Sequence, residues 1–386
     1  MEFSLNSDQI AFIKSARAFS EGELAPHAAH WDEEHYFPKK TFVEAGKLGF
    51  MGLYTPQVAG GLGFGRLDSS LIIEELAKGC TVITAFITIH NMVVSMIGRY
   101  GSESLISEWC PQLVTGEKLA SYCLTEPAAG SDAASLTTRA ILDGNHYIVN
   151  GDKAFISGAG ETDLLVVMLR TGTKGPKGIS ALAIPADSKG ITYGKNEIKM
   201  GWRAQPTRAI SFENVQVPVA NLLGSEGQGF KIAMEGLDGG RINIGTCSVG
   251  TAQAALEAAL IYTSERKQFG QAIIDFQVTQ FKLADMATEL VAARQLVRLA
   301  AYKLDQNEPE ATTYCAMAKR FATDIGFRIC DEALQLHGGY GYMCEYPIER
   351  YLRDTRVHKI LEGTNEIMRV IIARRLMLEG AMESIR

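Results

Sequence analysis

The chain has 386 residues, of which 46% are hydrophobic and 21% charged, and its formal net charge is −6. This length and composition are enough for two or three domains around a substantial core and exclude a disordered chain. We expect no nucleic-acid partner, because the chain is acidic and has no basic cluster. The seven cysteines are scattered without any CxxC pair, so we predict neither a disulfide framework nor a metal site.

Residues 1–118 show helical periodicity interrupted by loops and predict an all-helical first domain. Their start resembles neither a signal peptide nor an Arg-rich transit sequence. We therefore expect a cytoplasmic protein, or a mitochondrial matrix protein if a transit peptide has been removed. Residues 79–98 carry no Asp, Glu, Lys or Arg, but they include several threonines, His90 and Asn91. They predict a buried helix, and we expect no membrane span.

The pattern changes to strands over residues 119–225. Asp143-Gly144 and Asn150-Gly151 are typical hairpin turns, and the short strands HYIV and KAFIS follow them. The stretches DLLVVMLRT, GISALAIPA and AISFENVQVP have strand length and are rich in branched residues. We predict a small β domain here.

Helical periodicity returns over residues 226–386, in the runs 227–269, 276–304 and 309–336 and in the terminal segment, and it predicts a bundle of long helices. The glycine-rich stretches 61–65 and 224–229 do not follow a strand in a βαβ unit. We therefore interpret them as loops or helix starts, not as a Rossmann or P-loop nucleotide site.

The terminal segment contains the candidate catalytic base, Glu362, between Leu361 and Gly363. A carboxylate in apolar surroundings holds its proton more tightly and can be tuned toward neutrality to remove a weakly acidic C–H proton. The alternative is a helix-capping glutamate without chemistry. This segment alone does not decide between the two.

Other features have both a structural and a functional interpretation. The polar loop 122–132 offers backbone N–H groups and the hydroxyls of Thr125 and Ser131, which suit a ring edge or a pyrophosphate, but the loop by itself favours a plain turn. Arg266 and Lys267 either complement a helix dipole or hold a phosphate. Arg241 follows two glycines within a helix, where a ligand or a neighbouring helix can approach closely.

Five motifs occur together in an order and spacing that resemble those of the acyl-CoA dehydrogenases over nearly the whole chain: YCLTEPAAGSDAAS, KAFISGAG, RKQFG, QLHGGYGY and LEGTNEI. The resemblance is closest to the short- and branched-chain members, of the isobutyryl type. It implies a mostly α, α+β fold with an N-terminal helical domain, a central β-barrel-like domain and a C-terminal four-helix bundle.

The resemblance implies a bound FAD. Phe155 stands where many relatives carry tryptophan and Ser157 where many carry threonine, so a stacking ring and a hydroxyl are kept. Contacts within one subunit are implied for Tyr122, Leu124, Thr125, Gly130, Ser131, Phe155, Ile156, Ser157, Thr364, Asn365 and Glu366. Glu366 contributes mainly through its backbone, at a helix start that favours a pyrophosphate. Contacts to the FAD of a neighbouring subunit are implied for Arg266, Phe269, Phe276, Gln277, Gln335, Gly338 and Gly339. A homotetramer, arranged as a dimer of dimers, follows from these shared sites.

The resemblance also implies an acyl-CoA substrate, held by Ser131, Asp238, Gly239, Gly240, Arg241 and Arg374. Glu362 takes the α proton, the β hydride goes to the flavin, and an electron-transferring flavoprotein collects the electrons. Isovaleryl and long-chain relatives place their glutamate at the position of Gly240, so a short 2-methyl-branched acyl group, isobutyryl, from valine breakdown is expected. Butyryl-CoA and 2-methylbutyryl-CoA remain open, because one methylene discriminates by only about 1–3 kcal/mol.

Two other functions are alternatives for such a chain. Acyl-CoA oxidases usually carry an additional C-terminal domain, which this chain length does not favour. A non-catalytic flavin- or acyl-CoA-binding protein would need no base at Glu362.

Overall fold

The computed structural model describes residues 4–379 and places six α-helices before the first strand. They are α1 (Ser7–Phe19), α2 (Ala28–Glu33), α3 (Lys39–Lys47), α4 (Arg66–Gly79), α5 (Thr81–Tyr100) and α6 (Glu103–Val114). Helix α1 begins with a capping box, in which Asn6 accepts from the Gln9 backbone and the Gln9 side chain accepts from the Asn6 backbone. A π-helical turn (Ser20–Leu24) follows it.

Helix α5 is the central helix of this first part and confirms the buried helix expected around residues 79–98. Among the described residues, α5 and a later helix, α7 (Gly229–Glu265), are long and apolar enough to cross a membrane, but 94% of the α5 window is buried inside the protein. Its polar residues hold the surrounding loops. Asn91 accepts from the Leu53 backbone at 2.7 Å, and His90 accepts from the Ala120 backbone at 3.2 Å. Asn91 and His90 are therefore satisfied inside the fold.

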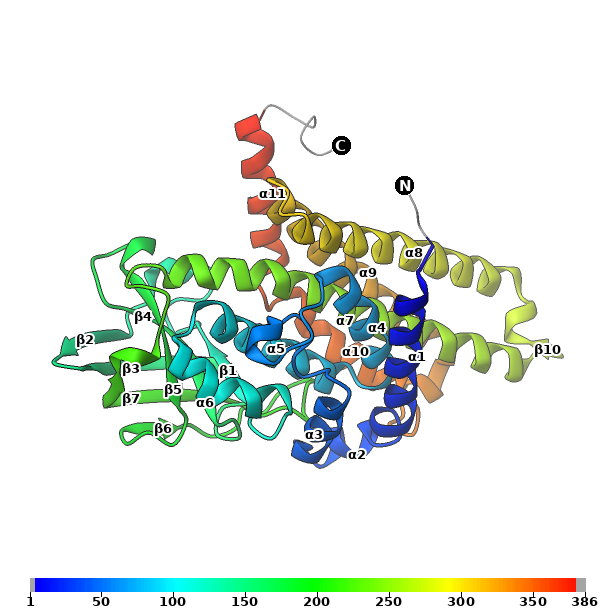
Figure 1. The fold of residues 1–386 in the computed structure, drawn as a ribbon. Helices are drawn as coiled ribbons and strands as arrows, with labels where there is room; N and C mark the ends of the chain where they lie inside the picture. The colour runs from blue at the N-terminus through cyan, green and yellow to red at the C-terminus, as the bar shows by residue number, and fades with distance from the viewer. Residues whose placement is uncertain (1–3, 380–386) are drawn as a thin grey trace.

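The β domain is an eight-stranded sheet at one end of the molecule (Figure 1). Its order is β6-β7-β3-β2-β4-β5-β8, and β1 pairs in parallel with β4. The strands are β1 (Ala120–Cys123), β2 (Arg139–Asp143), β3 (His146–Ser157), β4 (Leu164–Arg170), β5 (Ile179–Pro185), β6 (Ile191–Tyr193), β7 (Thr207–Pro218) and β8 (Leu222–Leu223).

One of the two predicted hairpin turns is wrong. Asp143 ends β2 and Gly144 starts the turn to β3, as expected, but Asn150 and Gly151 lie inside β3. The strand continues there because it pairs with β7, and the pairing register shifts between Val149 and Gly151. Gly151 therefore marks a β-bulge, with φ 140°, where turn chemistry suggested a chain reversal.

The C-terminal part consists of α7 (Gly229–Glu265), α8 (Gln277–Asp305), α9 (Ala311–His337), α10 (Ile348–Arg356) and α11 (Asn365–Glu379). Helix α7 runs from the β domain to the opposite end of the molecule, and α8 and α9 pack along it (Figure 1). The first predicted run is too long, since α7 ends at Glu265. A small hairpin, β9 (Lys267–Gln268) and β10 (Gln271–Ala272), follows, with positive φ at Phe269 and Gly270 as expected for a two-residue turn.

Candidate active site

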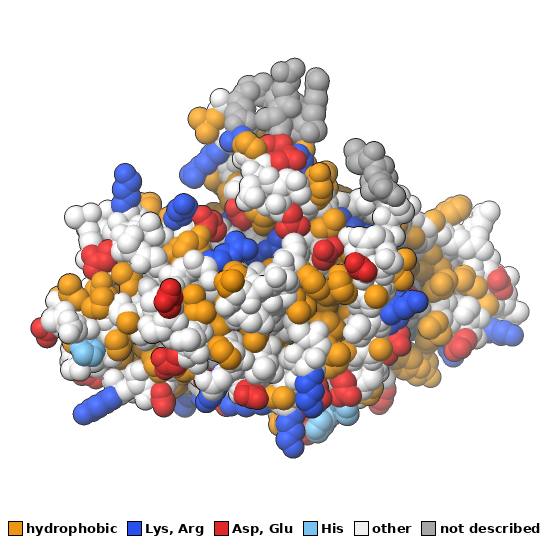
Figure 2. Space-filling model, viewed as in Figure 1, with side chains coloured by type: hydrophobic (Ala, Val, Ile, Leu, Met, Phe, Trp, Pro, Cys, Tyr) orange, Lys and Arg blue, Asp and Glu red, His pale blue; other side chains and the backbone are white. Residues whose placement is uncertain are grey.

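The candidate site is a cavity of about 460 Å³ where the β domain meets α7 and α11. In Figure 2 basic side chains gather in a hollow of the surface beside α11. The sequence-predicted residues that line the cavity are Tyr122, Leu124, Thr125, Gly130, Ser131, Phe155, Ile156, Ser157, Arg241, Glu362 and Arg374. Segments far apart in the chain are thus brought together around one space.

Glu362 lies on the connection into α11, in a left-handed backbone conformation. Its φ is 57°, and that of Gly363 is 89°. Thr364 then caps the helix by accepting from the Ile367 backbone at 3.3 Å. The Oε2 atom of Glu362 is buried and has no hydrogen-bond partner among the described residues. Burial raises the pKa of this carboxyl to about 7, although the charges of Arg241 and Lys319 oppose the shift. The group is therefore poised to take a proton near neutral pH.

Helix α7 approaches Glu362 closely because it has no side chain at Gly240. A Cβ atom at this position would lie 2.3 Å from Oε2 of Glu362. The next residue, Arg241, is buried and donates to Asp238 at 2.6 Å, and Asp238 accepts in turn from Thr312 at 2.6 Å. Asp238 therefore orients Arg241 from beside the cavity.

A buried ion pair, which sequence reasoning missed, holds the loop that follows β1. Glu126 accepts from Lys153 at 2.8 Å and from the backbone of Thr137 and Thr138. Lys153 also donates to the Leu124 carbonyl at 2.9 Å. Burial alone would raise the pKa of Glu126, but Lys153 and the other donors outweigh it and hold the pKa at about 2. The only hint in the sequence is a charged residue within a loop of small residues.

Trp202 is a cavity residue that the sequence did not reveal. Its backbone N–H donates to Asp354 at 2.7 Å, and its indole donates to His358 at 3.3 Å. His358 also bonds Ser248 of α7 at 2.8 Å. This wall of the cavity is thereby tied to the helical part of the chain.

The cavity fits a flat aromatic cofactor. Phe155 lines it with positive φ and 69% of its surface exposed, so its ring is free to stack on a flat group. The buried Tyr122 hydroxyl has no partner among the described residues. Gly130 has open space on its side-chain face, and the loop around it offers backbone donors.

Asn365 and Glu366, also predicted at the cofactor, do not line the cavity. The Asn365 side chain is buried and turned into the helical core, where it bonds α9. The Glu366 side chain points outward and is 80% exposed. The Asn365 side chain is therefore unavailable to a ligand, and only its backbone groups are left.

The remaining predicted residues lie elsewhere. Arg266, Gln335, Gly338 and Gly339 line a separate cavity of about 600 Å³ near the β9–β10 hairpin, at the end of the bundle opposite the β domain (Figure 1). Phe269, on the turn of this hairpin, is 96% exposed. Phe276 contacts its ring edge to face, and Gln277 is exposed at the start of α8. Within one chain these residues do not reach the Glu362 cavity.

Three family models match successive parts of the chain. They describe the acyl-CoA dehydrogenase N-terminal domain (residues 6–117), middle domain (121–215) and C-terminal domain (227–377). A Bos taurus protein named "Isobutyryl-CoA dehydrogenase, mitochondrial" is 53% identical over 375 residues, covering 97% of this chain and 90% of that protein.

Solved structures agree with the family models. Butyryl-CoA dehydrogenase from Megasphaera elsdenii matches with a TM-score of 0.94 and 39% identity, covering 98% of this chain and 100% of that one. A chain in a structure titled for the electron transferring flavoprotein of Acidaminococcus fermentans matches with a TM-score of 0.95 and 40% identity, covering 98% and 100%. The chain therefore belongs to the acyl-CoA dehydrogenase family and is an FAD-containing oxidoreductase.

Proposed function

We propose that this enzyme converts isobutyryl-CoA to methacrylyl-CoA in valine breakdown, with Glu362 as the base. The observation that carries the proposal is the Glu362 carboxyl in the cavity: its Oε2 atom is buried without a hydrogen-bond partner among the described residues, and burial raises its pKa to about 7. The bovine relative named isobutyryl-CoA dehydrogenase supports the choice of substrate.

Each group at the cavity has a separate role in the proposed reaction. Glu362 takes the α proton of the thioester, and its backbone N–H stabilises the negative charge that develops on the thioester oxygen. Bound FAD supplies the acceptor for the β hydride. Arg241 and Arg374 provide cationic contacts for the acyl-CoA at the same cavity.

The apolar part of the lining sets the acyl preference. It includes Ile89 and Met92 of α5, Leu237 of α7, and Ile367 and Ile371 of α11. Such a wall favours an apolar acyl chain over a polar one. Butyryl-CoA and 2-methylbutyryl-CoA are the competing substrates, because one methylene changes binding by only about 1–3 kcal/mol.

The proposal also includes the oligomeric state, the electron acceptor and the location of the enzyme. Arg266, Phe269 and the 335–339 segment contact the FAD of a neighbouring subunit in a homotetramer, which is consistent with their distance from the cavity of their own chain. An electron-transferring flavoprotein accepts the electrons, an assignment supported by the matching chain in the Acidaminococcus structure. The name of the bovine relative supports a mitochondrial location.

Anaerobic titration of the purified yellow protein tests the proposal. Isobutyryl-CoA, butyryl-CoA, 2-methylbutyryl-CoA and isovaleryl-CoA are compared by the loss of flavin absorbance near about 450 nm. We expect isobutyryl-CoA to bleach the flavin fastest. Faster bleaching by butyryl-CoA would overturn the branched substrate, and no bleaching by any of the four would overturn the proposed reaction.

A further inference from the structure

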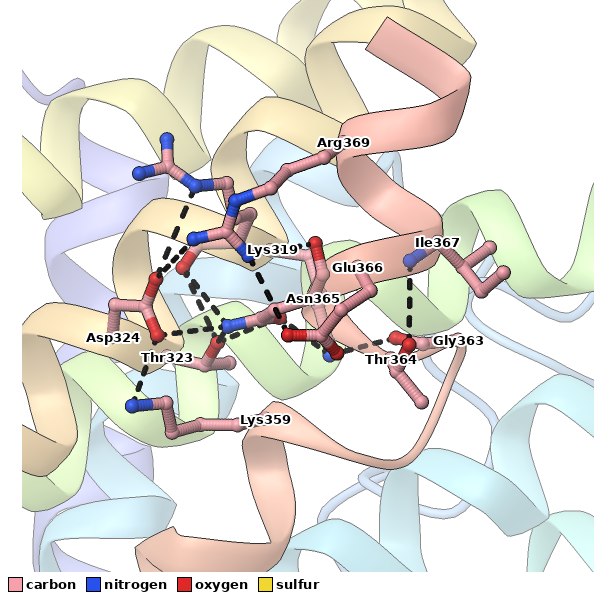
Figure 3. Close-up of polar contacts among 11 residues, drawn as sticks. Lys319, Thr323, Asp324, Lys359, Gly363, Thr364, Asn365, Glu366, Ile367 and Arg369 are labelled. Atoms are coloured by element: carbon pink, nitrogen blue, oxygen red, sulfur yellow. Dashed lines mark hydrogen bonds and ion pairs between the residues drawn. The ribbon is translucent and has the colours of Figure 1, made fainter. Parts of the chain in front are cut away.

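A lysine that no step of the reaction uses lies fully buried next to the Glu362 connection. Lys319 of α9 is 0% exposed. Its ammonium donates to the Gly363 carbonyl at 2.8 Å and to Oδ1 of Asn365 at 2.9 Å (Figure 3). One side chain thus binds both the residue after Glu362 and the first residue of α11.

Asn365 is itself fixed, so Lys319 binds a rigid acceptor. The Asn365 amide donates to Thr323 at 3.0 Å and to Asp324 at 3.0 Å, both on α9. Asp324 also forms an ion pair with Lys359 at 3.1 Å, toward the surface of the protein. Figure 3 shows these contacts converging between α9 and the start of α11. The connection that carries Glu362 is therefore attached to α9 through several polar contacts at this point.

The backbone at this connection needs such an attachment. Glu362 and Gly363 both have positive φ, and a non-glycine residue in this region costs about 1–3 kcal/mol unless its surroundings hold it there. The Gly363 carbonyl belongs to the residue directly after Glu362. A donor that holds this carbonyl therefore restricts the backbone from which the Glu362 side chain projects.

Burying the charged Lys319 side chain costs free energy, which argues against a role in packing alone. Its two bonded partners are neutral oxygens, and no carboxylate lies within ion-pair distance of it among the described residues. Burial lowers the pKa of Lys319 to about 7. The largest opposing contribution comes from the negative charge of Glu362, which favours the protonated lysine. An apolar side chain would pack at this position without that cost.

We propose that Lys319 is the positioning residue of the base: its ammonium fixes the Glu362–Gly363 connection against α9 and places a positive charge near the carboxylate that takes the substrate proton. This inference rests on the proposed role of Glu362.

Other titratable groups also interact electrostatically with Glu362 and Lys319. Arg241 of α7, Tyr122 of β1 and Tyr54 interact electrostatically with Glu362. Asp324, Arg241, Glu366 and His358 interact with Lys319. All of them remain in place when Lys319 alone is changed.

The test compares Lys319→Met and Lys319→Gln with Lys359→Met, in the FAD-loaded protein. Lys359→Met is the matched control, because it removes an ammonium from the same network without touching Gly363 or Asn365. The rate of flavin reduction at saturating isobutyryl-CoA is measured against pH, together with substrate affinity and FAD content.

For Lys319→Met we expect a fall of about 10- to 100-fold in the reduction rate, as for a misplaced catalytic group, with substrate affinity retained. Because the positive charge lowers the pKa of Glu362, its removal moves the acid limb of the profile to higher pH. Lys319→Gln keeps an N–H donor without the charge. It regains part of the rate but keeps the shifted limb, and it carries the test if Lys319→Met does not bind FAD.

The proposal is overturned if Lys319→Gln shows the wild-type rate and profile, or loses rate with an unshifted acid limb, as a merely structural residue would. The Glu362→Gln variant distinguishes a failure of the proposed base from a failure of the proposed role of Lys319. Full reduction by Glu362→Gln would remove the proposed base itself, whereas an inactive Glu362→Gln beside a normal Lys319→Gln would remove only the role of Lys319.

Discussion

Gly240→Ala tests the geometry around Glu362 with the smallest possible change. The added Cβ would lie 2.3 Å from Oε2 of Glu362, against the 3.4–4 Å of ordinary contact. The contact atom is the end of a flexible side chain, so the carboxylate moves by about 1 Å and the helix does not. A misplacement of about 1 Å in a reacting group costs about 10²-fold in rate.

The same substitution should not destabilise the protein. Alanine is favoured over glycine within a helix by about 1 kcal/mol, so the thermal midpoint of Gly240→Ala should not fall. Gly245→Ala on the same helix is the matched control, because its Cβ would meet Val297 at 3.3 Å and no carboxylate. Stopped-flow reduction by isobutyryl-CoA measures both variants. A wild-type rate in Gly240→Ala, or an equal loss in both variants, would refute the reasoning.

Three further predictions follow from the site. The rate of flavin reduction should rise with pH through about 7. At lower pH the raised pKa of Glu362 keeps this residue protonated, so it cannot act as a base. A flat stopped-flow profile over this pH range would contradict the prediction. Lys153→Met should destabilise the holoprotein by about 3–5 kcal/mol, since it leaves the buried Glu126 carboxylate without its cation; an unchanged denaturant midpoint would count against it. Phe155→Ala should weaken FAD binding by about 1 kcal/mol through lost stacking, seen as faster FAD loss on dilution, while Phe155→Trp should retain the cofactor.

Local sequence patterns predicted most of the helical part. Helices α8 and α9 begin and end within two residues of the predicted runs, because their apolar spacing is set by burial along their whole length. The resemblance found the cavity residues from Tyr122 to Ser131 and Glu362, since these lie in contiguous motifs.

Contacts between distant segments could not be predicted in this way. Asn150-Gly151 has the composition of a turn, but pairing with β7 keeps it in a strand. The bond from Trp202 to His358 joins residues 156 positions apart, and neither stands out within its own segment. The inward orientation of the Asn365 side chain likewise depends on Lys319 and Thr323 of another helix.

The central claim is that Glu362 removes the substrate proton. The most direct measurement is anaerobic addition of isobutyryl-CoA to Glu362→Gln beside the wild type, after both have been shown to carry equal FAD. The account predicts that the wild type bleaches and that Glu362→Gln stays yellow, because an amide cannot take the α proton. Bleaching of Glu362→Gln at the wild-type rate would contradict it.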